Sequence, residues 1–285
     1  MCPDNIDVDS GQLPGVTVDN KQLNQSDIRA NDGSTWINVL CDAQGRLITS
    51  ALTGFGADFS FGQVATAATA RVLVNATTYT EQTTNAQRSI ASASANDTAA
   101  GTGARTVNIT YYDQLGVGPY TETVTLNGTT YVNTIATNIC FIEEMQIITA
   151  GSGGTNAGIL TLKAAAGGGG ATIGTIAASA GQTYWAHHYV PSGKTCNITG
   201  LSCSHNGTTV GSGALFTINA LQIGVANAAE KQVSDFVRLY GQASTFTRVY
   251  YSPIKVIGPA RIRVFVTPES TSAFTYRSSF DFFEP

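Results

Sequence analysis

Charged side chains are scarce in this 285-residue chain, where they make up 12% of the residues. That fraction is about half of what soluble domains usually carry. The scarcity is uneven, because Lys163 and Lys194 are the only charged side chains between Glu144 and Glu230. A free monomer normally relies on interspersed charge for its solubility. The uncharged stretch therefore predicts either a surface that faces other subunits or a surface of Thr, Ser and Asn that stays soluble without charge.

The cysteines lack the spacing that a zinc ribbon or a disulfide framework requires. Their number is odd, and no two of them form a C-x-x-C pair. Most lie among apolar residues, so we expect small core side chains. Cys196 and Cys203 are candidates for cross-strand neighbours, and we expect them to stay reduced. The five cysteines are Cys2, Cys41, Cys140, Cys196 and Cys203.

The sequence also has no recognisable targeting or membrane segment. Its N-terminus lacks a basic stretch followed by an apolar one, so no signal peptide is expected. The apolar stretch at 164–180 is mainly Ala and Gly, which is too weak for a membrane span. A broad basic face for nucleic-acid phosphates is missing as well. We therefore expect neither a membrane nor a nucleic acid as a partner.

The net charge of −4 is concentrated at one end of the chain. Residues 1–35 contain six acids but only two cations, Lys21 and Arg29, and the remainder is balanced. This segment has few large apolar residues, so it cannot bury enough surface to fold by itself. We expect an extended N-terminal arm that becomes ordered on a neighbouring molecule. Its acids are Asp4, Asp7, Asp9, Asp19, Asp27 and Asp32.

Alternation of apolar and polar residues dominates the rest of the chain. In the stretch at 107–112, Val107, Ile109 and Tyr111 fall on one face. A period of two indicates strands that each bury one face. Asn127-Gly128 is a strong hairpin signal, so residues 107–134 are predicted to form a three-strand meander. With further short strands between turns, the pattern predicts an all-β fold, either a jelly-roll-like or an Ig-like β-sandwich.

Three phrases in the central region carry a resemblance to a known family. They are ANDTAAGTGARTVNI, ETVTLNGTT and ITAGSGGTNAGILTL (Ile148 to Leu162), and they cover roughly the middle third of the chain. In these phrases the chain resembles virion structural proteins of tailed bacteriophages. No catalytic motif accompanies them. The resemblance thus implies a component of the particle without indicating which part.

One short helix is predicted at Ala228 to Tyr240. Asn227 is a candidate N-cap, and Glu230 completes a capping box. The apolar positions 233, 236, 237 and 240 form one helical stripe, which Gly241 can end. The predicted organisation is an extended arm at 1–35, a hairpin and linker region at 36–90, and a main β-sandwich domain at 91–285 that either includes 36–90 or stands beside it.

No motif predicts catalysis, a cofactor or a metal. His187 and His188 are adjacent on an expected strand, where they point to opposite faces and cannot easily share an ion, although His205 could join one of them. Glu143 and Glu144 also face apart and have no partner at a defined spacing. We therefore expect a non-enzymatic protein without catalytic, cofactor-binding or metal-binding residues.

The stretch from Phe236 to Arg263 holds five cations and no acid. A solvated face is the ordinary interpretation, and a docking surface for an acidic segment is the sharper hypothesis. The only strongly acidic segment available is the chain's own arm. The predicted interaction residues are therefore Asp4, Asp7, Asp9 and Asp19 of the arm with Arg238, Arg248, Lys255, Arg261 and Arg263.

These features favour a structural protein of a tailed-phage virion, present as a homo-oligomer and assembled in the cytoplasm of the host bacterium. A capsid decoration or cement role fits an arm and an uncharged face, since cement proteins cross subunit boundaries. The expected partners are copies of the chain and other virion proteins, such as the major capsid protein or tail proteins. The alternative is a tail, neck, baseplate or fibre protein that contacts the host, with a surface glycan as a further partner. A third hypothesis is a carbohydrate-binding or hydrolytic module, which requires exposed aromatic side chains and carboxylates in one groove.

Overall fold

The computed structural model describes residues 28–31, 36–39, 58–66, 71–75, 78–207, 213–224, 228–234, 236–240, 244–269 and 274–284. The chain divides into two units, Met1–Phe55 and Gly56–Pro285. In the first unit, β1 (Ile28–Asn31) pairs antiparallel with β2 (Trp36–Val39). The predicted arm therefore contains a strand near its end. Its residues Asp4, Asp7, Asp9 and Asp19 lie outside the described part of the chain.

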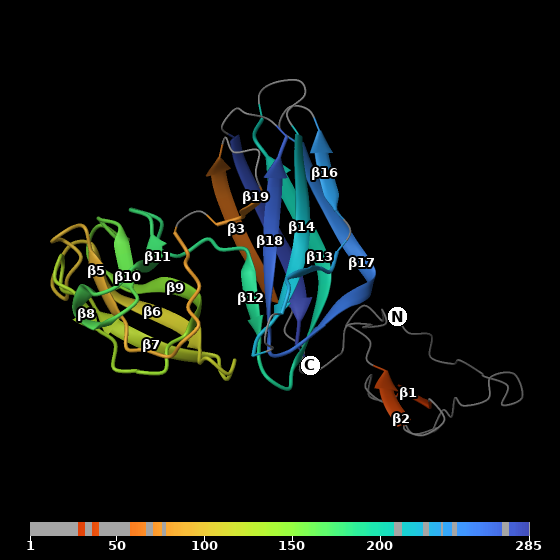
Figure 1. The fold of residues 1–285 in the computed structure, drawn as a ribbon, viewed down its shortest axis with the longest axis horizontal. Helices are drawn as coiled ribbons and strands as arrows, with labels where there is room; N and C mark the ends of the chain where they lie inside the picture. Colours follow the sequence, from red (N-terminus) through yellow and green to blue (C-terminus); the bar gives the residue numbers. More distant parts are fainter. Residues whose placement is uncertain are drawn as a thin grey trace, which may run out of the picture. The chain divides into compact units, whose positions relative to one another are not determined.

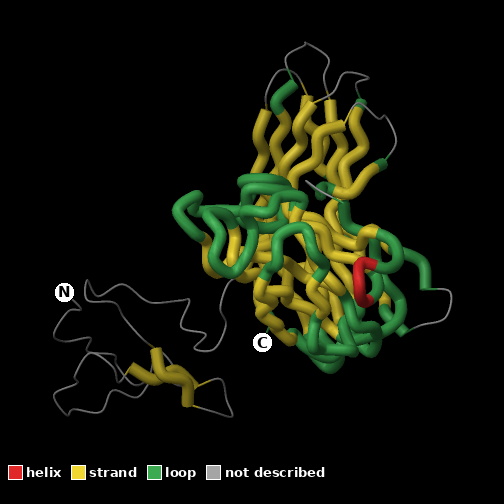
Figure 2. The backbone as a smooth tube through the Cα atoms, turned by 90° about the vertical axis from the view of Figure 1, so that its left-hand side faces the viewer, coloured by secondary structure: helices red, strands yellow, loops and turns green. Residues whose placement is uncertain are grey.

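Two antiparallel sheets of the second unit form a sandwich around the larger hydrophobic core (Figure 1). Strands account for most of the described backbone, as the yellow segments of Figure 2 show. One sheet consists, in order, of β17 (Ser244–Ile257), β13 (Thr195–His205), β19 (Phe274–Phe283) and β3 (Asp58–Thr66). The other consists of β12 (His187–Val190), β18 (Ala260–Pro268), β14 (Gly213–Gln222) and β15 (Lys231–Gln232), with β16 (Val237–Tyr240) paired to β14 and β4 (Val72–Leu73) paired to β18.

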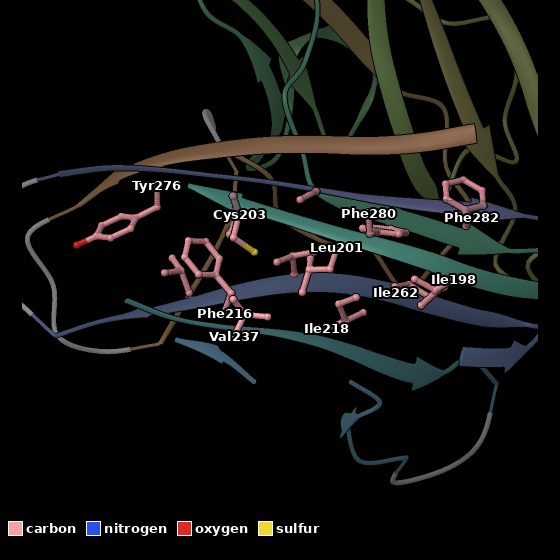
Figure 3. Close-up of a cluster of buried hydrophobic side chains, with 14 of the residues drawn as sticks. Ile198, Leu201, Cys203, Phe216, Ile218, Val237, Ile262, Tyr276, Phe280 and Phe282 are labelled. Carbon is pink, nitrogen blue, oxygen red and sulfur yellow. The ribbon is translucent and has the colours of Figure 1, made fainter. Parts of the chain in front are cut away.

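The alternation of side chains along β19 shows how the sandwich core arises. Every second residue is buried, from Phe274 through Tyr276 and Phe280 to Phe282. Figure 3 shows Tyr276, Phe280 and Phe282 in one cluster with apolar side chains such as Phe216 of the opposite sheet. Full burial of one such side chain stabilises the fold by roughly 1.5–3 kcal/mol. The predicted all-β sandwich class is confirmed. The aromatic side chains of β19 contribute to the sandwich core along the length of the strand.

The strands between β4 and β12 form two smaller sheets, which we call the β5–β11 lobe. Its core is separate from that of the sandwich and includes Ile90, Ile109 and Met145. One sheet consists, in order, of β11 (Thr172–Ile176), β10 (Leu160–Lys163), β5 (Ser89–Ser92) and β8 (Val132–Asn133). The other consists of β7 (Tyr120–Thr125), β6 (Ala104–Tyr112) and β9 (Phe141–Ala150) (Figure 1).

The predicted three-strand meander forms only in part. β6 and β7 pair as expected, and Val107, Ile109 and Tyr111 are buried together. The third strand of this sheet is β9, however, while β8 pairs with β5 in the other sheet. β8 has only two residues, whereas β9 buries Ile142 and Met145 in the lobe core. The longer and more apolar strand therefore takes the place beside β6.

The predicted helix at Ala228 to Tyr240 is wrong. The described residues of this stretch contain β15 and β16 instead. Within the described residues the only helical segment is a 3-10 turn, η1 (Ala166–Gly168), drawn red in Figure 2. No helix in that part of the chain has the length and hydropathy that a membrane span requires. Val237 and Leu239 are buried and alternate with exposed neighbours, which is the period of a strand.

Tertiary pairing explains why the helical spacing fails here. β16 pairs with β14 and places Val237 and Leu239 in the sandwich core. Phe236, which the helical stripe would bury, is 61% exposed. Glu230, the expected capping residue, accepts a hydrogen bond from Arg263 of β18. β-Branched and aromatic residues suit a pleated surface, so the sheet outweighs the helical pattern.

Candidate functional site

Two regions of the second unit contain candidate functional side chains. One is an exposed surface at the edge of the sandwich, and the other is a buried cluster beside β12. The exposed surface consists of β16 and β17, which contact each other at one edge of the sandwich (Figure 1). β17 is the last strand of its sheet and, among the described residues, pairs only with β13. The exposed large apolar side chains of β16, β17 and Phe236, which precedes β16, are Phe236, Tyr240, Phe246, Val249, Tyr251 and Ile257. We call this surface the β16–β17 flank.

The second half of β17 is protected against the addition of another strand. Its register with β13 jumps there, so residues 250–253 bulge from the ladder. Pro253 has no N–H to donate, and Lys255 places a charge on the edge. Bulges, prolines and lysines are the features that keep sheet edges from pairing with other chains. A partner therefore meets this half of the flank through side chains such as Tyr251, which is fully exposed.

The five predicted cations lie on three strands rather than on one surface. Arg238 is on β16, and its guanidinium lies 2.6 Å from the carboxylate of Glu269. Arg248 and Lys255 are on β17, where Arg248 lies over the ring of Tyr250. The structure thus brings three of the five to the β16–β17 flank. The other two, Arg261 and Arg263, are on β18.

Arg261 and Arg263 take part in ion pairs with acids of the second unit. Arg261 is almost fully buried and contacts the carboxylate of Glu81. Burial, with a smaller effect from Arg263, lowers the pKa of Arg261 to about 9. Arg263 donates to Glu230 Oε1 from Nε at 2.8 Å and from Nη2 at 2.6 Å. No spacing in the sequence indicates these partners, and docking of the arm on the five cations stays a prediction.

The buried cluster centres on His188 of β12, a strand that contacts β9 of the β5–β11 lobe. Its Nδ1 lies 2.9 Å from Oε1 of Glu143, and its Nε2 lies 2.8 Å from Oε1 of Glu284. Burial alone lowers the pKa of His188, but the two carboxylates outweigh it and raise the pKa to about 9. At neutral pH the ring is therefore an imidazolium that donates from both nitrogens.

His187 has a different set of partners. Its Nε2 lies 2.8 Å from the carbonyl oxygen of Glu143, so Nε2 carries the hydrogen and donates it. Nδ1 is then an acceptor, and it is buried without a hydrogen-bond partner among the described residues. Burial lowers the pKa of His187, which keeps the ring neutral. His205, the third histidine considered from the sequence, lies at the opposite end of β13 from Cys196.

A cavity of about 390 Å³ adjoins His187 and His188. Trp185 lines it but is only 4% exposed, because its ring packs against that of Tyr79 with 4.8 Å between centroids. A sugar-binding face needs an exposed ring, so Trp185 does not supply one. Carboxylates and aromatic rings that also line the cavity belong to Glu143, Glu144, Glu284, Phe61 and Phe282.

One serine–histidine pair has the separation of a nucleophile and its base. Ser244 Oγ lies 2.8 Å from His205 Nε2. The amide of Gly207 donates to Nδ1 of the same ring at 3.0 Å, so Nε2 must carry the hydrogen. Nε2 therefore donates to Ser244 and cannot take its proton, which a general base has to do. The pair contributes a hydrogen bond between strand ends rather than an activated serine.

No family model matches the chain. No curated protein matches it significantly either. Among solved structures, the chain is similar to the T13 particle of infectious bursal disease virus, with a TM-score of 0.25 and 8% identity over 80% of this chain and 69% of that chain. The Gx strain of the same virus gives a TM-score of 0.24 and 9% identity, over 80% and 72%. The VP2 subviral particle of this virus gives a TM-score of 0.24 and 9% identity, over 80% and 71%.

Proposed function

We propose that the chain is a non-enzymatic structural protein of a tailed-bacteriophage virion and assembles with copies of itself through the β16–β17 flank. The observation that carries the proposal is the group of exposed apolar side chains on this flank. Exposed apolar surface, where it is contiguous, is characteristic of sites where proteins meet, and β16 and β17 are in contact. The proposed occupant is a second copy of the chain. The stretch at 145–229, which lies outside the flank, has only two charges, so it adds little repulsion between copies.

The virion assignment draws its support from the sequence. The phrases that resemble tailed-phage virion proteins lie in the β5–β11 lobe, where they form parts of β6, β7, β9 and β10 and loops between strands. Within the particle we propose a capsid decoration or cement role, since an arm and a self-associating flank suit a protein that bridges neighbouring subunits. A tail, neck, baseplate or fibre position is the alternative. Host contact, through a surface glycan for example, belongs to that alternative.

Light scattering on the purified full chain tests self-association through the flank. The wild type at micromolar concentration should be larger than a monomer. A Val249→Ser/Tyr251→Ser double variant should shift towards the monomer, because both side chains are exposed on the flank. Ile135→Ser is the matched control, since Ile135 is 88% exposed but lies in the β5–β11 lobe. A monomeric wild type, or an equal effect of the control, would contradict this part of the proposal.

The copy number per particle tests the virion assignment separately. Quantitative mass spectrometry of purified virions should detect the chain at a fixed ratio to the major capsid protein. Hundreds of copies would support the decoration or cement role. A handful of copies, in multiples of three, five or six, would favour the tail or neck instead. Absence of the chain from purified particles would refute a virion role.

A further inference from the structure

Three side chains with different donor atoms converge at the edge of the cavity. They are His188 of β12, Cys196 of β13 and Glu284, which follows β19. One donor atom from each residue lies within 4.8 Å of the other two. Ligands that surround a tetrahedral Zn²⁺ are about 3.3–3.8 Å apart, given bond lengths of about 2.0–2.3 Å. Small side-chain rotations therefore bring this set to binding distance.

The histidine of this set is already oriented as a metal ligand would be. Glu284 contacts its Nε2, whereas Glu143 contacts Nδ1 on the opposite side of the ring. The second oxygen of Glu143 accepts the amide hydrogen of Tyr189 at 2.9 Å, which fixes the carboxylate. The ring also stacks on Phe282, with 4.1 Å between centroids. A carboxylate on the remote nitrogen is the usual outer-shell partner of a metal-bound histidine.

We propose that His188 Nε2, the Cys196 thiolate and the Glu284 carboxylate form a binding site for Zn²⁺. The ion takes the position of the proton that His188 shares with Glu284. Binding releases that proton and the thiol proton to solvent. A water molecule from the adjoining cavity completes the tetrahedron, because His188 and Glu284 both line that cavity.

The chemistry of the donors selects this class of ion. A thiolate with an imidazole suits Zn²⁺, whereas Mg²⁺ and Ca²⁺ require six or more oxygen ligands. In the ion-free protein, burial and the carboxylates of Glu284 and Glu143 raise the pKa of the Cys196 thiol well above its usual range. A divalent cation at the same point reverses this effect, because it stabilises the coordinated thiolate. The ion would join β12, β13 and the residue that follows β19, which is a structural role independent of the assembly proposed above.

The site is tested by titrating the full, reduced chain with ZnCl₂ in a calorimeter and with CoCl₂ in a spectrophotometer. The wild type should bind one equivalent of Zn²⁺, and Co²⁺ should give a thiolate charge-transfer absorption. Cys196→Ser should abolish the absorption. Cys203→Ser is the matched control, because Cys203 is a buried free cysteine on the same strand whose sulfur faces Ser278 Oγ at 3.6 Å. This control should leave both signals unchanged.

Two further variants separate the site from general damage to the fold. Glu143→Gln keeps the shape of the outer-shell residue and should weaken Zn²⁺ binding about 10–100-fold. Glu284 lies beyond the last strand, so Glu284→Gln should remove Zn²⁺ binding while the circular dichroism stays that of the wild type. This variant therefore tests the site even if Cys196→Ser folds poorly. Failure of the wild type to bind Zn²⁺ would overturn the proposal. Binding that survives both Cys196→Ser and Glu284→Gln would overturn it too, because the ion would then sit on another thiol such as Cys2 or Cys41.

Discussion

Asp97 and Ala157 are 60 residues apart in the sequence, and the amide of Ala157 donates to Asp97 Oδ1 at 2.8 Å. The amides of Ala104 and Gly158 donate to the same carboxylate at 2.7 and 2.9 Å. A Cβ on Gly103 would lie 2.1 Å from Oδ1, so only glycine fits beside this carboxylate. Two of the phrases that resemble phage virion proteins therefore meet at one fully buried side chain of the β5–β11 lobe.

Replacing Asp97 with Asn should destabilise the β5–β11 lobe. The Asp97 carboxylate is acceptor-only and receives three amide hydrogens and the Ser92 hydroxyl hydrogen. An amide group presents an NH₂ to some of these donors and leaves them buried without an acceptor. That loss costs about 1–3 kcal/mol per group. Urea unfolding of Asp97→Asn should show a lower midpoint. Asp113→Asn is the control and should unfold close to the wild type, because the two amide hydrogen bonds that Asp113 Oδ1 accepts are exposed to water.

The same carboxylate should make stability fall in acid. Burial by itself raises the pKa of Asp97, but the hydrogen bonds from Ser92 and three amides outweigh it and lower the pKa below its usual value. A folded-state pKa below the unfolded value of about 3.9 contributes stability that is present above pH 3.9 and lost as the pH falls through the folded pKa. The difference in unfolding free energy between wild type and Asp97→Asn should therefore shrink below about pH 4. A difference that stays constant down to pH 2 would show that Asp97 is not held ionised.

Local alternation predicts strands well in this chain but not their partners. β19 could be predicted because it buries every second side chain, and β6 because Val107, Ile109 and Tyr111 alternate with less buried neighbours. The sequence predicted β8 beside β6, but β9 takes this place. The choice depends on how much apolar surface each of the two strands buries, which the local pattern does not show. The apolar residues at 228–240 fit both the period of a helix and the period of a strand. The pairing of β16 with β14 favours the strand. His188 could be named as a candidate from the sequence, whereas Glu284, 96 residues away, could not, because no local pattern brings the two together.

Leu239→Ala should be much more costly than Phe236→Ala. Leu239 is buried in the sandwich core, so its truncation should reduce the free energy of unfolding by about 2–5 kcal/mol. Phe236 is exposed, and its truncation should change that energy by no more than about 0.5 kcal/mol. Denaturant unfolding of both variants measures the two effects. A larger loss for Phe236→Ala than for Leu239→Ala would instead support the helix that the sequence predicted at 228–240.

The chain without residues 1–55 should keep its fold but attach less tightly to the particle. The cut follows the boundary between the two units, so the β-sheets of the second unit stay complete and circular dichroism should be unchanged in shape. Residues 1–35 carry the net charge of −4, whereas the described β16–β17 flank presents Arg238, Arg248 and Lys255. Single exposed ion pairs stabilise by only about 0–1 kcal/mol, but we expect several pairs, repeated around a ring of subunits, to fix the direction of docking.

Co-sedimentation with virions that lack the chain measures this attachment at increasing salt. Binding of the full chain should weaken with salt, because exposed charges are screened over about 8 Å at physiological ionic strength. The truncated chain should bind more weakly and lose most of this salt dependence. A full-length variant with Asp4, Asp7, Asp9 and Asp19 changed to Asn is the control that keeps the length of the arm, and it should behave like the truncated chain if charge directs the docking. Equal binding of the truncated and full chains would show that the arm has no part in attachment. Unfolding of the truncated chain would show that the fold of the second unit depends on residues 1–55.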